Sequence, residues 1–262
     1  MSSIDPAPAT SIRELAMNPE HPARALDAIA RIHLAKDPPE VLEKLMHVTV
    51  AIGASASLYT AAIPEDGSET SSFSLFACDP GFALEQDTQG PLLNHPWFRF
   101  ARTHTSPGTD HQIPLQAGAD AEAIELARRY GFKSCLVVPA SAGIDIERHE
   151  MLCLGSRNAD AFEGEDARIV RTLARSLAAE LHDWLTGHLR QRLQQAARLH
   201  PSDVDLLALE RQGLGSKEIS LRTGLSIASV DSRFQRINAR MKCANRKAAA
   251  RRAAAYGLLE ST

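Results

Sequence analysis

The chain has 262 residues, which exceeds the usual size of a single domain, so we expect two domains. Apolar residues make up 44% and charged residues 23%, as is ordinary for a globular cytosolic protein. No apolar run approaches the roughly 20 residues that span a bilayer. The N-terminus has no basic segment followed by an apolar core, so we expect no signal peptide and a cytoplasmic location.

Cysteine and histidine spacing gives no sign of a metal site. The four cysteines lie far apart, with no CxxC pair and no Cys/His cluster: Cys78, Cys135, Cys153 and Cys243. This predicts neither structural zinc nor a disulfide framework. The chain also has no glycine-rich nucleotide-binding loop. We therefore expect no metal, no cofactor and no catalytic activity.

The net charge of −3 is unevenly distributed. Residues 189–262 hold 14 of the 29 Lys and Arg residues but only 6 of the 32 Asp and Glu residues, a net charge of +8. The first 188 residues hold the remaining 15 basic and 26 acidic residues, a net charge of −11. A polyanionic partner is therefore expected for the C-terminal part alone.

Hydrophobic periodicity predicts an α+β N-terminal domain over residues 22–187, after a mobile tail over 1–21. The pattern predicts a sheet covered by helices on both faces, an α/β/α sandwich with mainly antiparallel strands. The expected helices are 22–35, 38–52, 97–105, 118–130 and 164–187. The expected strands are 56–63, 72–77, 134–139 and 150–155, with a turn at 64–67 and loops through most of 78–114.

The long helix over 164–187 carries an apolar stripe that includes Leu173, Leu177 and Leu181. One hypothesis is that these leucines help to hold a dimer, and the alternative is that they cover the sheet. Residues 188–198 would form a linker to the C-terminal domain.

Residues 199–262 are predicted to form four short helices around a helix–turn–helix. Pro201 suits a first helical position and Asp203 can serve free N–H groups at a helix start. Ser216 and Ser226 are expected to cap the second and third helices, with Gly224 at the bend between them. In the second helix, Ile219 and Leu221 are expected to point inward.

The third helix has two stripes of equal spacing. Val230, Phe234, Ile237 and Met241 form a buried stripe, and one residue earlier in each repeat stand Ser229, Arg233, Arg236 and Arg240. One face packs while a neighbouring face is basic, as a recognition helix in a DNA major groove requires. Asp231 lies on the far side of the buried stripe, away from the arginines.

This segment resembles the LuxR-type helix–turn–helix of bacterial quorum-sensing regulators over about 60 residues. The matching motifs are the opening Leu199-His200-Pro201-Ser202-Asp203, then Leu207, Gly213, Glu218-Ile219-Ser220, Ser226 to Val230, Asn245-Arg246 and Ala253 to Leu259. His200 replaces the family's capping threonine, which should weaken that helix start by roughly 1 kcal/mol.

The resemblance implies a homodimeric transcription regulator that binds a two-fold symmetric operator in double-stranded DNA, with RNA polymerase as a further partner. Arg233 and Arg236 are expected to contribute most to DNA affinity. The full set of expected DNA contacts is Ser216, Lys217, Ser226, Ser229, Ser232, Arg233, Arg236, Arg240, Lys242, Asn245, Arg246 and Lys247.

The N-terminal half is similar, more loosely, to the family's autoinducer-binding domain. With Pro96 aligned to the family's motif proline, the ligand positions are occupied by Phe82, Gln86, His95, Asp110 and Cys135, with Trp97 beside them. All five differ from the residues that bind acyl-homoserine lactones. Neutral His95 could accept a hydrogen bond through only one ring nitrogen. A competing register through Asp79-Pro80 misplaces the downstream segment. We therefore do not expect a standard acyl-homoserine lactone.

Three interpretations of this half remain open. It could bind another small-molecule signal in a pocket lined by some of Phe73, Phe76, Phe82, Trp97, Phe98, Phe100 and Phe132. Those aromatics could instead form a filled core, leaving a ligand-independent regulator or interaction protein that serves dimerisation or captures a partner. In the third, an enzyme or thiol sensor would use Cys78, Cys135 or Cys153, although buried cysteines usually behave as small apolar residues.

Overall fold

The computed structural model describes residues 12, 18–65, 69–116, 118–140 and 148–259. The chain divides into two compact units. The first comprises residues 1–61, 72–141 and 149–184, and the second comprises 62–71, 142–148 and 185–262. Each unit has its own buried core. Most of the predicted N-terminal tail, the centre of the 64–67 turn and the last three residues lie outside the described part of the chain.

A five-stranded sheet forms the centre of the first unit. Its strands are β1 (Ala56–Pro64), β2 (Thr70–Ala77), β3 (Gly108–Thr109), β4 (Ser134–Pro139) and β5 (His149–Ser156), in the order β2-β1-β5-β4-β3. β4 pairs antiparallel with both β3 and β5, with Leu136 opposite Leu154. All but the first residue of β5 are buried, which explains its nearly continuous run of apolar residues.

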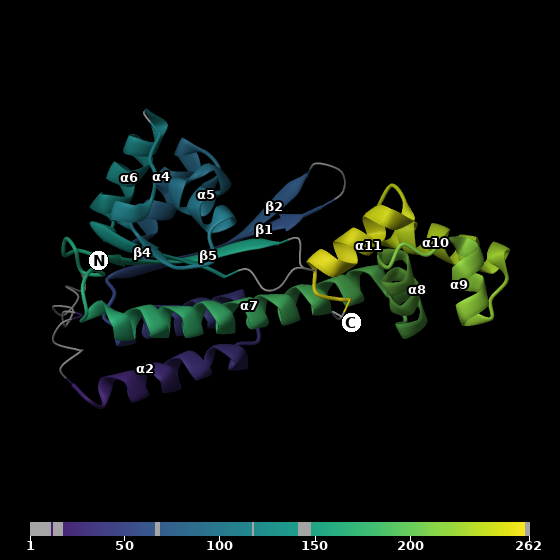
Figure 1. The fold of residues 1–262 in the computed structure, drawn as a ribbon, viewed down its shortest axis with the longest axis horizontal. Coiled ribbons are helices and arrows are strands. Elements are labelled where there is room, and N and C mark those ends of the chain that lie inside the picture. Colours follow the sequence, from purple (N-terminus) through teal and green to yellow (C-terminus); the bar gives the residue numbers. More distant parts are fainter. Residues whose placement is uncertain (1–11, 13–17, 66–68, 117, 141–147, 260–262) are drawn as a thin grey trace. The chain divides into compact units, whose positions relative to one another are not determined.

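Helices cover both faces of this sheet (Figure 1). On one side lie α4 (Pro80–Gln89), α5 (Pro96–Thr103) and α6 (Ala119–Arg129). On the other lie α2 (His21–Ala30), which packs on α3 (Pro38–Ile52), and α7 (Ala167–Ala197). Short 3-10 turns occupy Ile32–Leu34, Leu92–Asn94 and Asp110–Gln112. The predicted α+β sandwich with a mainly antiparallel sheet is confirmed.

The first half of α7 packs on the sheet through the predicted leucine stripe. Leu173, Leu177 and Leu181 are each no more than 2% exposed within a single chain. These leucines therefore cover the sheet, and the hypothesis that they hold a dimer is wrong because their surface is already buried. The outward positions of this part of α7 are mostly polar, so a dimer would need other residues.

A buried polar cluster lies among these apolar contacts. The Tyr59 hydroxyl donates to the Glu150 carboxylate, and His182 Nδ1 lies 3.0 Å from both Glu150 oxygens. The Glu150 side chain is fully buried and that of His182 is 9% exposed. A buried carboxylate needs such partners, because desolvation without them is costly. The cluster thus joins β1, β5 and α7.

Two helices differ from the sequence-based expectation. The segment that forms α4 was expected to be a loop, because its sequence has no clear helical period of apolar residues. The structure shows the reason, since Pro80–Gln89 buries only Phe82 and Gln86. α7 was expected to end near residue 187 but continues to Ala197. Gly187 lies within this helix, and Leu189, Leu193 and Ala197 continue the buried stripe at a spacing of four residues.

The second unit is mostly helical. After the last part of α7 it contains α8 (Pro201–Arg211), α9 (Ser216–Thr223), α10 (Ile227–Met241) and α11 (Arg246–Ala255). The apolar core includes Leu206, Leu207, Ile219 and Ala253, together with the predicted stripe of α10. Leu193 and Ala197 of α7 join the same core. In the part of the chain that the structure describes, every helix is too short or too polar to span a membrane.

Candidate nucleic-acid interface

Local caps define the helix–turn–helix of the second unit. The Asp203 carboxylate accepts from the His200 N–H at 3.2 Å, as predicted for the start of α8. Gly224 adopts φ +72° at the bend between α9 and α10, a backbone region that favours glycine. The Ser226 hydroxyl then accepts from the Ser229 N–H at 3.2 Å, and Asn245 caps α11 through the Ala248 N–H at 2.9 Å. These contacts set where each helix begins.

The start of α9 departs from the prediction in one detail. Ser216 is the first helical residue, so Gly215 takes the cap position and its N–H donates to the Glu218 carboxylate at 2.8 Å. The Ser216 hydroxyl instead donates to Asp231 Oδ1 at 2.6 Å, and Arg246 Nη1 donates to Ser216 Oγ at 2.8 Å. A glycine has no side-chain oxygen, so the carboxylate three residues later satisfies the free N–H.

α10 has one buried face and one exposed face. Val230, Phe234, Ile237 and Met241 are each no more than 3% exposed. The opposite half of the helix carries Ala228, Ser232, Gln235, Arg236 and Ala239, all of them exposed except the half-buried Ser232. The helix therefore presents an exposed face of short and polar side chains, and a DNA major groove admits an α-helix.

The three arginines of α10 have different surroundings. Arg240 is held inside the unit, where its Nη2 lies 2.8 Å from Asp203 Oδ2 and its Nη1 donates to the Arg198 carbonyl at 2.8 Å. Arg233 is half-buried and donates to Ser202 Oγ at 3.2 Å. Arg236 is exposed and, among the described residues, its side chain donates only to Ser232 Oγ on its own helix, at 3.0 Å. Arg236 is thus the arginine of α10 with the least restricted side chain.

The ion pair with Arg240 also affects the pKa of Asp203. Burial raises the pKa of Asp203, but the hydrogen bonds from Arg240 and from the His200 N–H, with the charge of Arg240, outweigh burial and leave the pKa below its usual value. The carboxylate therefore stays ionised and ties α8 to α10. Arg246 lies beside Glu210 of α8, with its Nε 3.0 Å from Glu210 Oε2, but there burial outweighs the charge of Arg246 and raises the pKa of Glu210.

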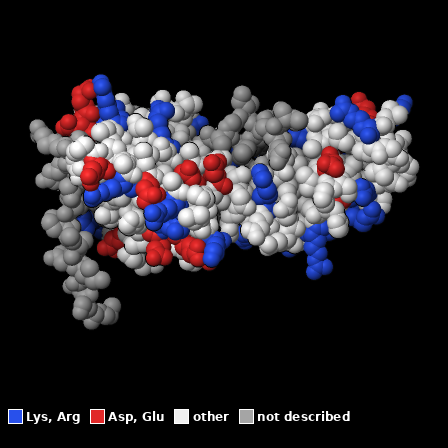
Figure 2. Space-filling view, turned by 90° about the horizontal axis from the view of Figure 1, so that it is seen from below, with Lys and Arg blue, Asp and Glu red and all other residues white. Residues whose placement is uncertain are grey.

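The other predicted DNA contacts lie at the helix ends. Lys217 is exposed in the first turn of α9, Lys242 is exposed at the end of α10, and Lys247 is exposed in the first turn of α11. Ser226 and Ser229 are exposed and lie 2.8 Å apart through their hydroxyl oxygens at the start of α10. On the face shown in Figure 2, the charged side chains of the second unit are Lys and Arg more often than Asp and Glu.

Two exposed residues of this unit were not anticipated. Leu221 was expected to point inward but is 79% exposed, because α9 buries only Ile219. Gln235 was not among the expected DNA contacts, although it lies on the outward face of α10. The spacing of the buried stripe already places Gln235 on the opposite side of the helix. It was missed because the DNA contacts were chosen mainly from the positively charged residues.

In the first unit, the structure brings three of the six expected ligand residues, Phe82, His95 and Trp97, into one aromatic cluster. The ring centroids of Phe82 and Phe132 are 5.4 Å apart, and those of Trp97 and Phe132 are 5.2 Å apart. His95 packs on Trp97 at 4.3 Å, and Phe76 on Phe82 at 6.0 Å. These distances are typical of aromatic rings in direct contact.

The buried polar atoms of the expected ligand residues His95, Trp97 and Gln86 are only partly satisfied. His95 Nδ1 accepts from the Trp97 N–H at 3.3 Å, and burial, the main cause, lowers the pKa of His95 to about 4. The imidazole is therefore neutral at pH 7. Among the described residues, His95 Nε2, Trp97 Nε1 and Gln86 Oε1 are buried without a hydrogen-bond partner. The other end of the Gln86 amide donates to the Gly90 carbonyl at 3.3 Å.

Asp110 and Cys135 also meet, since Asp110 Oδ1 accepts from the Cys135 N–H at 3.2 Å. By contrast, Phe73 lies away from the aromatic cluster and packs on Trp184 of α7 at 5.9 Å.

Burial, with a smaller contribution from Asp79, raises the pKa of the Cys78 thiol to about 12, and burial raises that of Cys153 well above its usual value. Such thiols stay protonated and are poor nucleophiles.

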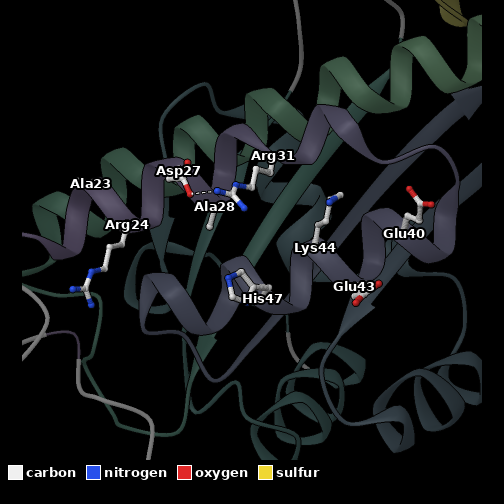
Figure 3. A pocket seen from close by; sticks show the side chains of 9 residues that line it. All are labelled: Ala23, Arg24, Asp27, Ala28, Arg31, Glu40, Glu43, Lys44 and His47. Carbon is white, nitrogen blue, oxygen red and sulfur yellow. Dashed lines mark ion pairs between the residues drawn. The ribbon is translucent and has the colours of Figure 1, made fainter.

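A separate groove of about 950 Å³ lies between α2 and α3 (Figure 3). Its side chains are mostly charged, and Arg31 pairs with Asp27 on the same helix at 2.9 Å. The nine residues that line it are Ala23, Arg24, Asp27, Ala28, Arg31, Glu40, Glu43, Lys44 and His47. None of the expected ligand residues is among them.

Within the part of the chain that the structure describes, no group of three or more His, Cys, Asp or Glu side chains is arranged to hold a metal ion.

Known structures share this fold. A crystal structure of SdiA from Escherichia coli matches with a TM-score of 0.67 and 12% identity, covering 91% of this chain and 99% of that protein. SdiA in complex with octanoyl-rac-glycerol matches with a TM-score of 0.67 and 13% identity, covering 94% and 99%. CepR2 from Burkholderia cenocepacia, an N-acylhomoserine lactone dependent LuxR family transcription factor, matches with a TM-score of 0.52 and 13% identity, covering 66% and 98%.

The likeness to SdiA extends over both units of the chain, and the expected LuxR-like fold is confirmed. Identities of 12–13% limit this conclusion to the fold. No protein-family model matches the sequence, and no curated protein matches it.

Proposed function

We propose that this protein is a sequence-specific DNA-binding transcription regulator that acts as a homodimer in the cytoplasm. The observation that carries the proposal is the exposed face of α10 in a capped helix–turn–helix, within a C-terminal segment (residues 189–262) whose net charge is +8. The LuxR-like fold supports it. A regulator of this kind acts by binding rather than catalysis, with double-stranded DNA and RNA polymerase as partners.

In this proposal the first unit binds a small-molecule signal at its aromatic cluster. The three unpartnered polar atoms of Gln86, His95 and Trp97 support it, because a ligand could hydrogen-bond to a neutral imidazole, an indole N–H and an amide oxygen. Neutral His95 and the carboxylate of Asp110 do not match the donors and acceptors of an acyl-homoserine lactone site, so the signal would have another chemistry. Ligand binding would shift the population of conformations that fit the operator.

A second candidate is a ligand-independent regulator whose N-terminal domain has a filled core and serves dimerisation or partner binding. Direct contact among the rings of Phe82, Trp97 and Phe132 supports it. A thermal-shift panel separates the candidates. A small molecule that raises the melting temperature of wild type but not of a Trp97→Phe variant favours the first, and no response across lactones and unrelated metabolites favours the second.

DNA binding is tested by fluorescence anisotropy with the full-length chain. The double variant Arg233→Ala/Arg236→Ala should bind duplex DNA more than tenfold more weakly than wild type, because each base or phosphate contact contributes about 1–3 kcal/mol. The matched control is Arg24→Ala/Arg31→Ala, on α2 and at its C-terminal cap, which removes the same charge from another exposed site. Equal affinities of the two double variants would refute the assignment of α10.

A further inference from the structure

The outward face of α10 contains one long polar side chain with distinctive surroundings. Val230, Phe234 and Ile237 mark the buried side of the helix. At about 100° per residue, Gln235 lies roughly 140° round the helix axis from Val230, on the opposite side. It is exposed, and its neighbours one turn away are the short side chains of Ser232 and Ala239 on one flank, with Asp231 and Asn238 on the other. An incoming surface can therefore approach Gln235 closely.

Gln235 also differs from every other polar side chain of α10 in its hydrogen bonding. Arg233, Arg236 and Arg240 each donate to an oxygen of the same chain. Asp231 accepts from Ser216, Ser229 bonds with Ser226, and Ser232 accepts from Arg236. Asn238, with its amide correctly oriented, donates to the Phe234 carbonyl and accepts from the Arg246 N–H, both at 3.2 Å.

Among the described residues, Gln235 makes no such contact. Each other polar side chain of this helix thus has at least one hydrogen-bond partner within the chain, whereas the amide of Gln235 has both its donor and its acceptor free.

A free carboxamide on a helix in the major groove matches one base in particular. Adenine presents the N7 acceptor and the N6 amino donor side by side, and glutamine binds both at once. Guanine presents two acceptors there and cytosine one donor, so neither base pairs with the amide N–H and the amide oxygen at the same time. Arginines that contact phosphate position a protein on DNA but carry no sequence information directly.

We propose that Gln235 is the principal specificity-determining residue of this protein and binds an adenine in each operator half-site. This inference rests on the proposed DNA-binding function and adds the residue and the base that set its sequence preference. It also separates two roles on α10, since the arginines would supply affinity while Gln235 supplies discrimination.

The test is selection of duplexes from a random pool by full-length wild type, Gln235→Ala and Gln235→Glu. Wild type should select an A·T pair at one position per half-site, with each mismatch there weakening binding about tenfold or more. Gln235→Ala should lose the preference at that position alone. Gln235→Glu should change it to C·G, because a carboxylate accepts from the cytosine amino group.

Gln195→Ala on α7 is the matched control, because this exposed glutamine lies in the same unit but outside the helix–turn–helix. It should leave the selected sequence unchanged. Wild-type circular dichroism is expected for every variant, since Gln235 is exposed and makes no hydrogen bond within the chain.

If wild type selects a sequence and both Gln235 variants select the same one, the assignment of Gln235 is overturned while DNA binding stands. If wild type enriches no duplex, the proposed function fails and this inference fails with it.

Discussion

Arg240→Ala should destabilise the second unit much more than Arg236→Ala, although both remove one arginine from α10. Arg240 is the ion-pair partner of Asp203, whose side chain is only 6% exposed. Removing Arg240 leaves that carboxylate buried with the His200 N–H as its remaining hydrogen-bond donor, and it deprives the Arg198 carbonyl of its donor. The ion pair therefore stabilises the junction of α8 and α10.

The size of the effect follows from the burial of the pair. Breaking a fully buried ion pair costs about 3–5 kcal/mol, but Arg240 is 32% exposed, so water screens part of the loss. We expect a decrease of about 2–3 kcal/mol in the free energy of unfolding. The exposed Arg236 side chain bonds, within the part of the chain that the structure describes, only to Ser232, so Arg236→Ala should change stability by less than about 0.5 kcal/mol.

Urea denaturation of the full-length chain, followed by circular dichroism, measures both variants. The pH dependence gives a second check, because the pKa of Asp203 is lowered in the folded chain. The stabilisation should be fully present above the unfolded pKa of about 3.9 and lost as pH falls through the lower folded value. Equal denaturation midpoints for the two variants at pH 7 would refute the structural role of Arg240.

Two further predictions concern the core of the first unit. Gly155→Ala should destabilise the chain by about 1–3 kcal/mol in urea denaturation, because the added Cβ would overlap the Phe132 ring and lie 2.9 Å from the Gly131 carbonyl oxygen. Gly187→Ala on α7 meets nothing within 4 Å and should be neutral or stabilising, so an equal loss in both would contradict the packing described. Glu150→Ala should cost about 3–5 kcal/mol by leaving buried polar partners unsatisfied, as judged by thermal denaturation, and an unchanged melting temperature would show that the buried cluster contributes nothing.

Much of the fold could be predicted from the sequence because its strongest signals are local. The stripe of Val230, Phe234, Ile237 and Met241 placed α10, and Gly224 with Ser226 placed the turn before it. Strands β4 and β5 followed from short apolar runs. α4 was missed because its burial is limited to Phe82 and Gln86, and no periodic pattern marks it.

The parts of the interface that could not be predicted depend on residues far apart in the sequence. Arg240 belongs to the same basic stripe as Arg233 and Arg236, and only the packing of α8 shows that Asp203 holds it. The outward position of Leu221 likewise depends on how α9 packs. Charge and spacing identified the right helix, but the roles of its side chains depend on contacts between helices.

The central claim is that the second unit binds double-stranded DNA through α10. Its most direct test is the affinity of the full-length chain for a labelled duplex, measured by anisotropy between 50 and 200 mM salt. We predict that affinity falls steeply across this range, because Lys and Arg side chains displace counterions from the phosphates. Binding that does not respond to salt, or no binding to any duplex at 50 mM salt, would contradict the claim.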